Sequence, residues 1–176
     1  RIAGYCLTGS IKEEALFFLY GQGGNGKGVF LNTLTAILGD YSVVAPMGVF
    51  IDNKFENHPT ELALLRGARL VTAQETQEGK AWNEVKIISL TGGDPIPARF
   101  MREDFFTFLP TFKLLIAGNH EPSIKSVNDA IIRRFNKLPF VHKPLIPDKD
   151  LKEKLKIEYS QILNWCIEGC LSWQKI

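Results

Sequence analysis

The segment at residues 21–27, with the sequence GQGGNGK, is the feature that most constrains how this chain can fold. It matches the GxxxxGK pattern of a phosphate-binding loop. The glycines allow a tight turn in which successive backbone N–H groups point at phosphate oxygens, and Lys27 supplies a positive charge for the β- and γ-phosphates. An apolar run at residues 15–20 predicts a buried strand before the loop. Apolar residues at helical spacing predict a helix over Lys27–Leu38 after it.

This strand–loop–helix context favours nucleotide binding over the alternative, a glycine-rich turn that happens to contain a lysine. The residues expected to contact the nucleotide are Gly21, Gln22, Gly23, Gly24, Asn25, Gly26, Lys27, Gly28 and Val29. Position 28 departs from the usual pattern, in which a Ser or Thr hydroxyl binds Mg²⁺. Because Gly28 has no side-chain oxygen, we expect the metal to be held more weakly or by a different arrangement of ligands.

The rest of the chain alternates between strand and helix patterns. Strands are predicted at residues 69–73, 113–117 and 135–141, and helices at residues 59–65, 82–90, 128–133, 148–157 and 160–173. A capping-box pattern at residues 10–13 predicts the start of a short helix, and residues 43–52 are expected to be mostly loop. Two apolar runs around a charged tip predict a β-hairpin over residues 96–108. This order predicts a three-layer α/β domain with a largely parallel central sheet.

Composition narrows the class of protein. With 176 residues, 45% of them hydrophobic and 23% charged, the chain is expected to be one globular domain over residues 1–176. A net charge of +2 argues against a strongly basic, histone-like binder. No apolar run is long enough to cross a membrane. Three cysteines without a CxxC pair favour a reducing, cytoplasmic compartment. A first residue that is not methionine suggests a fragment of a longer protein.

Five segments follow one another in order: GQGGNGKGVFLNTL, ARLVTAQET, SLTGGDPIPARF, KLLIAGN and DAIIRRFNKLPF. Together they resemble the superfamily 3 helicases, a group of AAA+-like P-loop NTPases, and specifically the helicase region of phage and plasmid primases. The resemblance covers residues 3 to 173. It implies a helicase that uses ATP and Mg²⁺ to translocate on DNA during replication of a phage, plasmid or integrated element. It also implies a homo-oligomer, most often a hexameric ring, and a primase domain upstream.

The same resemblance implies roles for residues outside the loop. Two acidic residues usually end the strand after the loop, and here Gln74 and Glu75 stand in those places. Glu75 therefore resembles the catalytic carboxylate and metal ligand, whereas the Gln74 amide is a poorer ligand for Mg²⁺. Asn119 matches the polar residue that contacts the γ-phosphate. Arg134 matches the arginine that enters a neighbouring subunit's ATP site, where a permanently charged fork stabilises the transition state.

Arg133 is the alternative to Arg134 for this role, and one of the two arginines could instead pair with Asp129. The predicted hairpin falls where these helicases grip DNA. Arg102 at its tip, with Arg99 nearby, is expected to contact the DNA backbone, although the neighbouring acidic residues weaken the charge argument. Phe100 could support a nucleotide or only the hairpin itself.

Two other functions remain open at this point. One is a catalytically weak ATP-binding scaffold on DNA, which Gly28 and Gln74 favour. The other is a P-loop kinase for a small molecule, which leaves Asn119, the two arginines and the hairpin unexplained.

Overall fold

The structure, a computed structural model, describes residues 1–52, 59–74, 80–124 and 128–175. Its helices and strands are, in order, α1 (Ile2–Tyr5), β1 (Leu16–Tyr20), α2 (Lys27–Leu38), β2 (Ser42–Val44), α3 (Pro59–Ala63), β3 (Leu70–Gln74), α4 (Glu84–Gly92), β4 (Ile96–Ala98), β5 (Phe106–Phe108), β6 (Lys113–Gly118), α5 (Asp129–Arg134), β7 (Phe135–Pro139), α6 (Leu151–Ile157) and α7 (Tyr159–Gln174), with short 3₁₀ turns at Gly39–Tyr41 and Met47–Val49. No helix among the described residues is both long and apolar enough to span a membrane.

Five parallel strands form the central sheet, in the order β2-β3-β6-β1-β7. The three inner strands are almost entirely buried. Near-continuous apolar runs of this kind are typical of a parallel sheet covered on both faces. The sheet confirms the predicted three-layer α/β fold.

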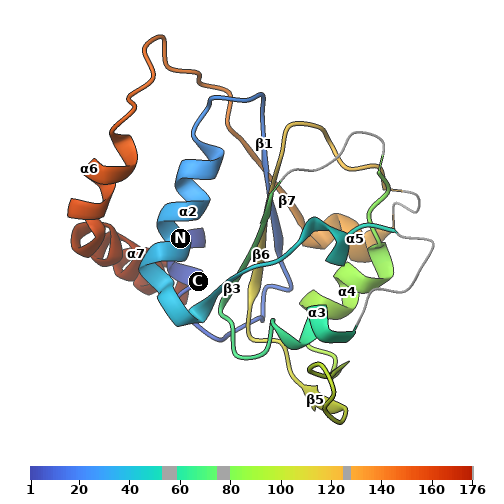
Figure 1. Cartoon of the computed structure of the whole chain (residues 1–176). Helices are drawn as coiled ribbons and strands as arrows, with labels where there is room; N and C mark the ends of the chain where they lie inside the picture. The colour runs from blue at the N-terminus through green and yellow to red at the C-terminus, as the bar shows by residue number, and fades with distance from the viewer. Residues whose placement is uncertain (53–58, 75–79, 125–127, 176) are drawn as a thin grey trace.

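Successive side chains of each strand point to opposite faces of the sheet, so each strand contributes to two cores. Phe17 and Leu19 of β1 pack with Leu31 and Leu34 of α2 on one face. Phe18 of β1 packs on the other face with α4 and α5 side chains. Figure 1 shows the resulting layers, with α2, α6 and α7 on one side of the sheet and α3, α4 and α5 on the other.

Most of the predicted elements form within a few residues of their expected bounds, and the hairpin of β4 and β5 is confirmed. One prediction is wrong, and one short strand was missed. Residues 10–13 form a turn instead of a helix, because the chain there bends into β1 and the backbone N–H of Glu13 donates to the Tyr5 hydroxyl. Residues 43–52 are mostly loop, as expected, but the first two of them belong to the missed edge strand β2, which pairs with β3. Its three residues carry too little pattern to be recognised alone.

Two buried or half-buried cations fix the N-terminal segment to the sheet. Lys113, at the start of β6, donates from Nζ to the carbonyl oxygens of Thr8 and Ser10. Burial lowers the pKa of Lys113 to about 8. Arg69, just before β3, donates to the carbonyl oxygen of Leu7 at 2.7 Å. The chain between α1 and β1 is therefore held at the edge of the sheet where the strands begin.

The helices α1 and α7 cross at two glycines. A side chain added at Gly4 would overlap the backbone atoms of Cys166 and Cys170, and one added at Gly169 would press on the backbone of Arg1. These glycines allow the two helix backbones to touch, which larger residues would prevent.

We expect Gly4→Ala to lower the free energy of unfolding by ~1–3 kcal/mol or more, the usual cost of forcing atoms into a packed site. Gly9→Ala is the matched control, because its added carbon would lie at an ordinary 3.7 Å from Thr111. Urea unfolding of both variants, followed by circular dichroism, makes the comparison. Equal free energies of unfolding in Gly4→Ala and Gly9→Ala would mean that the two helices can move apart without a loss of stability.

Candidate functional site

The register of the sheet brings three chain segments to one level. Tyr20, the last residue of β1, pairs with Gly118 of β6 on one side and with Pro139 of β7 on the other. The phosphate-loop segment, Asn119 and Phe140 therefore leave the sheet next to one another. This is the carboxyl edge of a parallel sheet, where ligands of such folds bind.

The loop itself has the backbone that its glycines predict. Gly24 and Gly26 have φ angles of +81° and +87°, which other residues rarely adopt. Gly21 has no room for a side chain, since an added carbon would overlap the carbonyl group of Phe140 and the side chain of Asn25. The Asn25 amide donates to that same carbonyl oxygen, so the loop is tied to the chain that follows β7.

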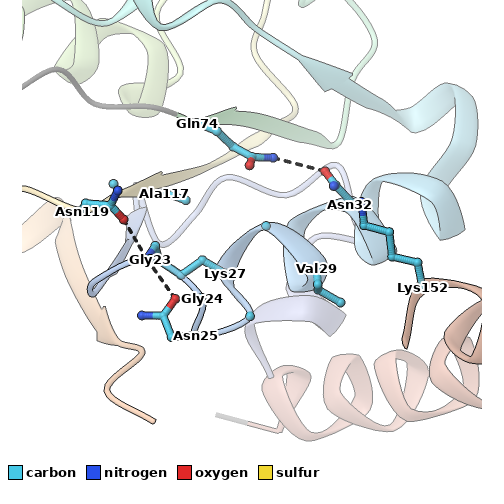
Figure 2. Close-up of a pocket in the computed structure, with 13 residues that line it drawn as sticks. Gly23, Gly24, Asn25, Lys27, Val29, Asn32, Gln74, Ala117, Asn119 and Lys152 are labelled. Carbon is cyan, nitrogen blue, oxygen red and sulfur yellow. Dashed lines mark hydrogen bonds between the residues drawn. The ribbon is translucent and has the colours of Figure 1, made fainter. Parts of the chain in front are cut away.

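Lys27 begins α2 and turns back into the loop. Its Nζ donates to the carbonyl oxygens of Gly21 at 2.5 Å and Gln22 at 3.1 Å. It also donates to Oδ1 of Asn25 at 3.0 Å and of Asn119 at 3.1 Å, as Figure 2 shows. The residue is only 7% exposed, and burial lowers the pKa of its ammonium group. An anion at this point would be stabilised by the cation and by the N-terminus of α2.

A cavity of about 400 Å³ opens beside the loop, within the range of small-ligand sites. Its lining comprises Gly23, Gly24, Asn25, Gly26, Lys27, Gly28, Val29, Asn32, Gln74, Ala117, Gly118, Asn119 and Lys152. Seven of the nine residues expected to contact the nucleotide are among these, together with Asn119. Gly21 and Gln22 instead contact Lys27 through their carbonyl oxygens.

The described part of the cavity offers amide groups as ligands for a metal ion. Gln74 at the end of β3 and Asn32 on α2 face each other across the cavity wall, where the Gln74 amide donates to Asn32 Oδ1 at 3.2 Å. Glu75, the expected catalytic carboxylate and metal ligand, lies outside the described residues. Within them no group of three or more His, Cys, Asp or Glu side chains is assembled. Amide oxygens are accepted ligands of Mg²⁺, although they bind it less strongly than carboxylates.

Arg134 is buried within this chain instead of facing outwards. Its side chain is 5% exposed, and it pairs with Glu14 and donates to Thr91 Oγ1 at 3.2 Å and to the Ala130 carbonyl at 2.9 Å. Arg133 is 66% exposed and reaches the same Glu14 carboxylate at 3.3 Å. In this arrangement the guanidinium group that a neighbouring molecule could reach belongs to Arg133. The ion pair that the sequence suggested with Asp129 is made with Glu14.

The three residues expected to contact DNA lie on the β4–β5 hairpin, at the end of the molecule opposite the phosphate loop (Figure 1). Arg102 is exposed at the tip, with a φ of +62°. The Arg99 guanidinium lies over the Phe105 ring, with 4.9 Å between its central carbon and the ring centroid. The Phe100 ring stacks on the Phe106 ring with 5.4 Å between the centroids. This contact favours the second of the two roles considered for Phe100, support of the hairpin itself.

Two polar side chains of the cavity, Asn32 and Lys152, were missed from the sequence. Asn32 stands four residues after Gly28, so helical spacing places both on the same face of α2 and could have indicated it. Lys152 reaches the cavity from α6, as Figure 2 shows. A lysine on a charged helix far along the chain carries no sequence signal for this position.

Comparison with known proteins gives one family and several relatives. The family model described as a family of unknown function (DUF5906) matches residues 19–156. The chain is 31% identical over 155 residues to Putative helicase L207/L206 of Acanthamoeba polyphaga mimivirus, covering 87% of this chain and 16% of that protein. It is 27% identical over 146 residues to Putative helicase 022R of Frog virus 3 (isolate Goorha), covering 80% of this chain and 15% of that protein. The chain thus spans only a small part of either relative.

Among solved structures, the fold is similar to the apo A form of the NrS-1 C-terminal region. The TM-score is 0.67 at 13% identity, over 88% of this chain and 36% of that one. An apo structure of the same region, residues 305–718, gives a TM-score of 0.65 at 12% identity, over 88% of this chain and 37% of that one. At these identities the likeness concerns the fold alone.

The buried position of Arg134 predicts a loss of stability in Arg134→Met. The change removes the buried guanidinium that both Glu14 and Thr91 contact and leaves Glu14 with only the exposed Arg133 as a charged partner. Hydrogen bonds to charged groups contribute ~2 kcal/mol each. Arg133→Met is the matched control and should change the free energy of unfolding by less than ~0.5 kcal/mol, as exposed substitutions usually do. Urea denaturation measures both, and equal effects would contradict the structural role of Arg134.

Proposed function

The chain belongs to the DUF5906 family, a family of unknown function, and we propose that it is the ATP-binding motor core of a replicative DNA helicase of superfamily 3 type. One observation carries the proposal. Lys27 lies at the carboxyl edge of the sheet, among the loop carbonyls and Asn119, beside a cavity of nucleotide size. The helicase names of the two viral relatives support a helicase function. DNA as the substrate, and replication of a phage, plasmid or integrated element as the setting, are what the resemblance to superfamily 3 helicases implies.

The cavity suits the triphosphate of ATP. Lys27 would leave its carbonyl partners for the β- and γ-phosphates, which offer stronger, charged acceptors. Asn119, already within hydrogen-bonding distance of Nζ, would lie next to the γ-phosphate. Glu75 directly follows Gln74 and would activate the attacking water and ligate Mg²⁺. When bound, the metal would neutralise charge on the phosphate oxygens.

Assembly into a homo-oligomeric ring would complete each site with an arginine from the next subunit. Arg133 is the better candidate for this role, because its side chain is exposed whereas that of Arg134 is engaged within its own chain. Arg134 and the shared Glu14 would then hold the helix α5 that presents Arg133. This assignment replaces the one that the resemblance alone favoured.

The hairpin of β4 and β5 would contact DNA. Arg102 is exposed at the tip and offers a cation for the phosphate backbone, while Phe100 and Phe106 stiffen the base of the hairpin by stacking. The Arg99 guanidinium is held over the Phe105 ring, so Arg99 would contact the DNA backbone only where the backbone comes close to the hairpin. A primase domain upstream remains an expectation from the resemblance.

The first test is nucleotide binding. We expect ADP to bind the wild-type chain and the affinity of Lys27→Ala to be at least ~100-fold lower, since a charge-assisted bond to phosphate is lost. Lys12→Ala is the matched control, because Lys12 is exposed on the segment that leads into β1, at the other end of that strand. Isothermal titration calorimetry measures all three. Equal affinities in Lys27→Ala and Lys12→Ala would end the phosphate-loop assignment.

The second test addresses the shared site and uses the full-length parent protein. Rings made only of Lys27→Ala subunits or only of Arg133→Ala subunits should both hydrolyse ATP poorly. The hydrolysis rate of Arg133→Ala rings should be ~10³-fold below that of wild-type rings, because an arginine supplied in trans contributes that much to phosphoryl transfer. Mixed rings should recover DNA-stimulated hydrolysis at interfaces that pair an intact Lys27 with an intact Arg133. If mixed rings form and recover no activity, the site is not shared through Arg133.

A further inference from the structure

Gly28, Asn32 and Gln74 form one corner of the cavity, and the geometry of two elements brings them together. Leu70, Thr72 and Gln74 alternate along β3, so Gln74 shares the face of Leu70, which packs in the α2 core. Gly28 and Asn32 lie one turn apart on α2 and point at that face. Figure 2 shows the Gln74 side chain extended across the cavity towards Asn32.

The missing side chain at position 28 leaves room for this contact. A carbon added at Gly28 would lie 3.3 Å from Oε1 of Gln74, tighter than about nine in ten such contacts, so the amide would have to shift by a few tenths of an ångström. Any residue with a side chain at position 28, including Ser or Thr, would press on the Gln74 amide as it is placed here. The two departures from the usual phosphate-loop pattern therefore lie next to each other in the cavity wall, and a side chain at position 28 would meet the Gln74 amide.

The hydrogen bond to Asn32 decides which end of the Gln74 amide faces the loop. An amide has a donating NH₂ end and an accepting oxygen end. Because the NH₂ group donates to Asn32 Oδ1 at 3.2 Å, the oxygen is turned towards Gly28. This places a neutral acceptor beside position 28, the position that carries the hydroxyl oxygen in the usual pattern.

We propose that Gln74 and Gly28 are a matched pair, in which the Gln74 amide oxygen replaces the hydroxyl normally present at position 28 as a ligand for the metal of a bound metal–nucleotide complex. Asn32 is the positioning residue that orients the amide. The proposal rests on the nucleotide site proposed above. An amide ligand carries no charge, so this site would hold the metal less tightly than one with a carboxylate in the same place.

The test uses Mn²⁺ as the metal probe and ADP as the nucleotide. Free Mn²⁺ is followed by electron paramagnetic resonance, and ADP affinity is measured separately in EDTA. Gln74→Leu should lower Mn²⁺ affinity in the presence of ADP by ~10-fold or more, as loss of a ligand or its support usually does. Gln74→Glu should raise it, because a carboxylate replaces the amide oxygen. Gln161→Leu, the same change at an exposed position on α7, should leave it unchanged.

Asn32 is tested by conservative rescue. Asn32→Ala removes the acceptor that orients Gln74 and should lower Mn²⁺ affinity by ~10-fold, within the range known for groups that support a ligand. Asn32→Asp keeps an acceptor oxygen at the same place and should retain the affinity. Equal losses in both variants would overturn the positioning role.

The pairing itself is tested by moving the oxygen from one residue to the other. Gly28→Ala should weaken Mn²⁺ binding in the wild-type background, because the added carbon displaces the Gln74 amide. It should have little further effect in Gln74→Ala, where no amide remains to be displaced. Gly28→Ser in that Gln74→Ala background should restore Mn²⁺ affinity through the hydroxyl.

The outcomes separate the two proposals. Wild-type Mn²⁺ affinity in Gln74→Leu, or the same effect of Gly28→Ala in both backgrounds, overturns the matched pair and leaves the nucleotide site standing. If the wild-type chain binds ADP neither with nor without Mn²⁺, the proposed function fails first.

Discussion

Parallel pairing of β1 with β6 on one side and β7 on the other is the constraint on which the candidate site depends. The register places Tyr20, Gly118 and Pro139 at one level, so the chain segments that follow them emerge together. Asn119 can therefore reach Lys27, and the Phe140 carbonyl can accept from Asn25. A shift of register by one residue would reverse which face each β1 side chain occupies and would separate these partners. The geometry of the loop is thus secured by the buried strands beneath it.

The sequence predicted the parts of this fold that rest on strong local patterns. The phosphate loop, the helix Lys27–Leu38 and the inner strands follow from glycine spacing and from apolar runs that only a covered parallel sheet explains. The short edge strand β2 and the helix α1 were missed, because three or four residues carry no periodicity. Their positions depend on partners distant in the chain, β3 and α7 respectively.

The candidate site likewise combines residues that local patterns predict with residues whose positions depend on tertiary contacts. Lys27 and Asn119 could be placed at one edge of the sheet because each follows a recognisable strand. Gly28 and Gln74 were noted separately as departures, and only the structure shows that they are neighbours in one cavity. The two adjacent arginines could not be told apart, because their difference lies in the tertiary contact with Glu14, a residue more than a hundred positions earlier. Helix α5 is too short for its pattern to say which arginine points inwards.

The crossing of α1 and α7 at Gly4 and Gly169 has a mechanical consequence. The first and last helices lie against each other, so the two ends of the described chain meet on one side of the molecule (Figure 1). Tension applied between those ends in a larger assembly would shear the contact between the helices before it reached the sheet. Until that contact opened, the strands that position the loop would carry little of the load, and the cavity beside Lys27 would keep its shape.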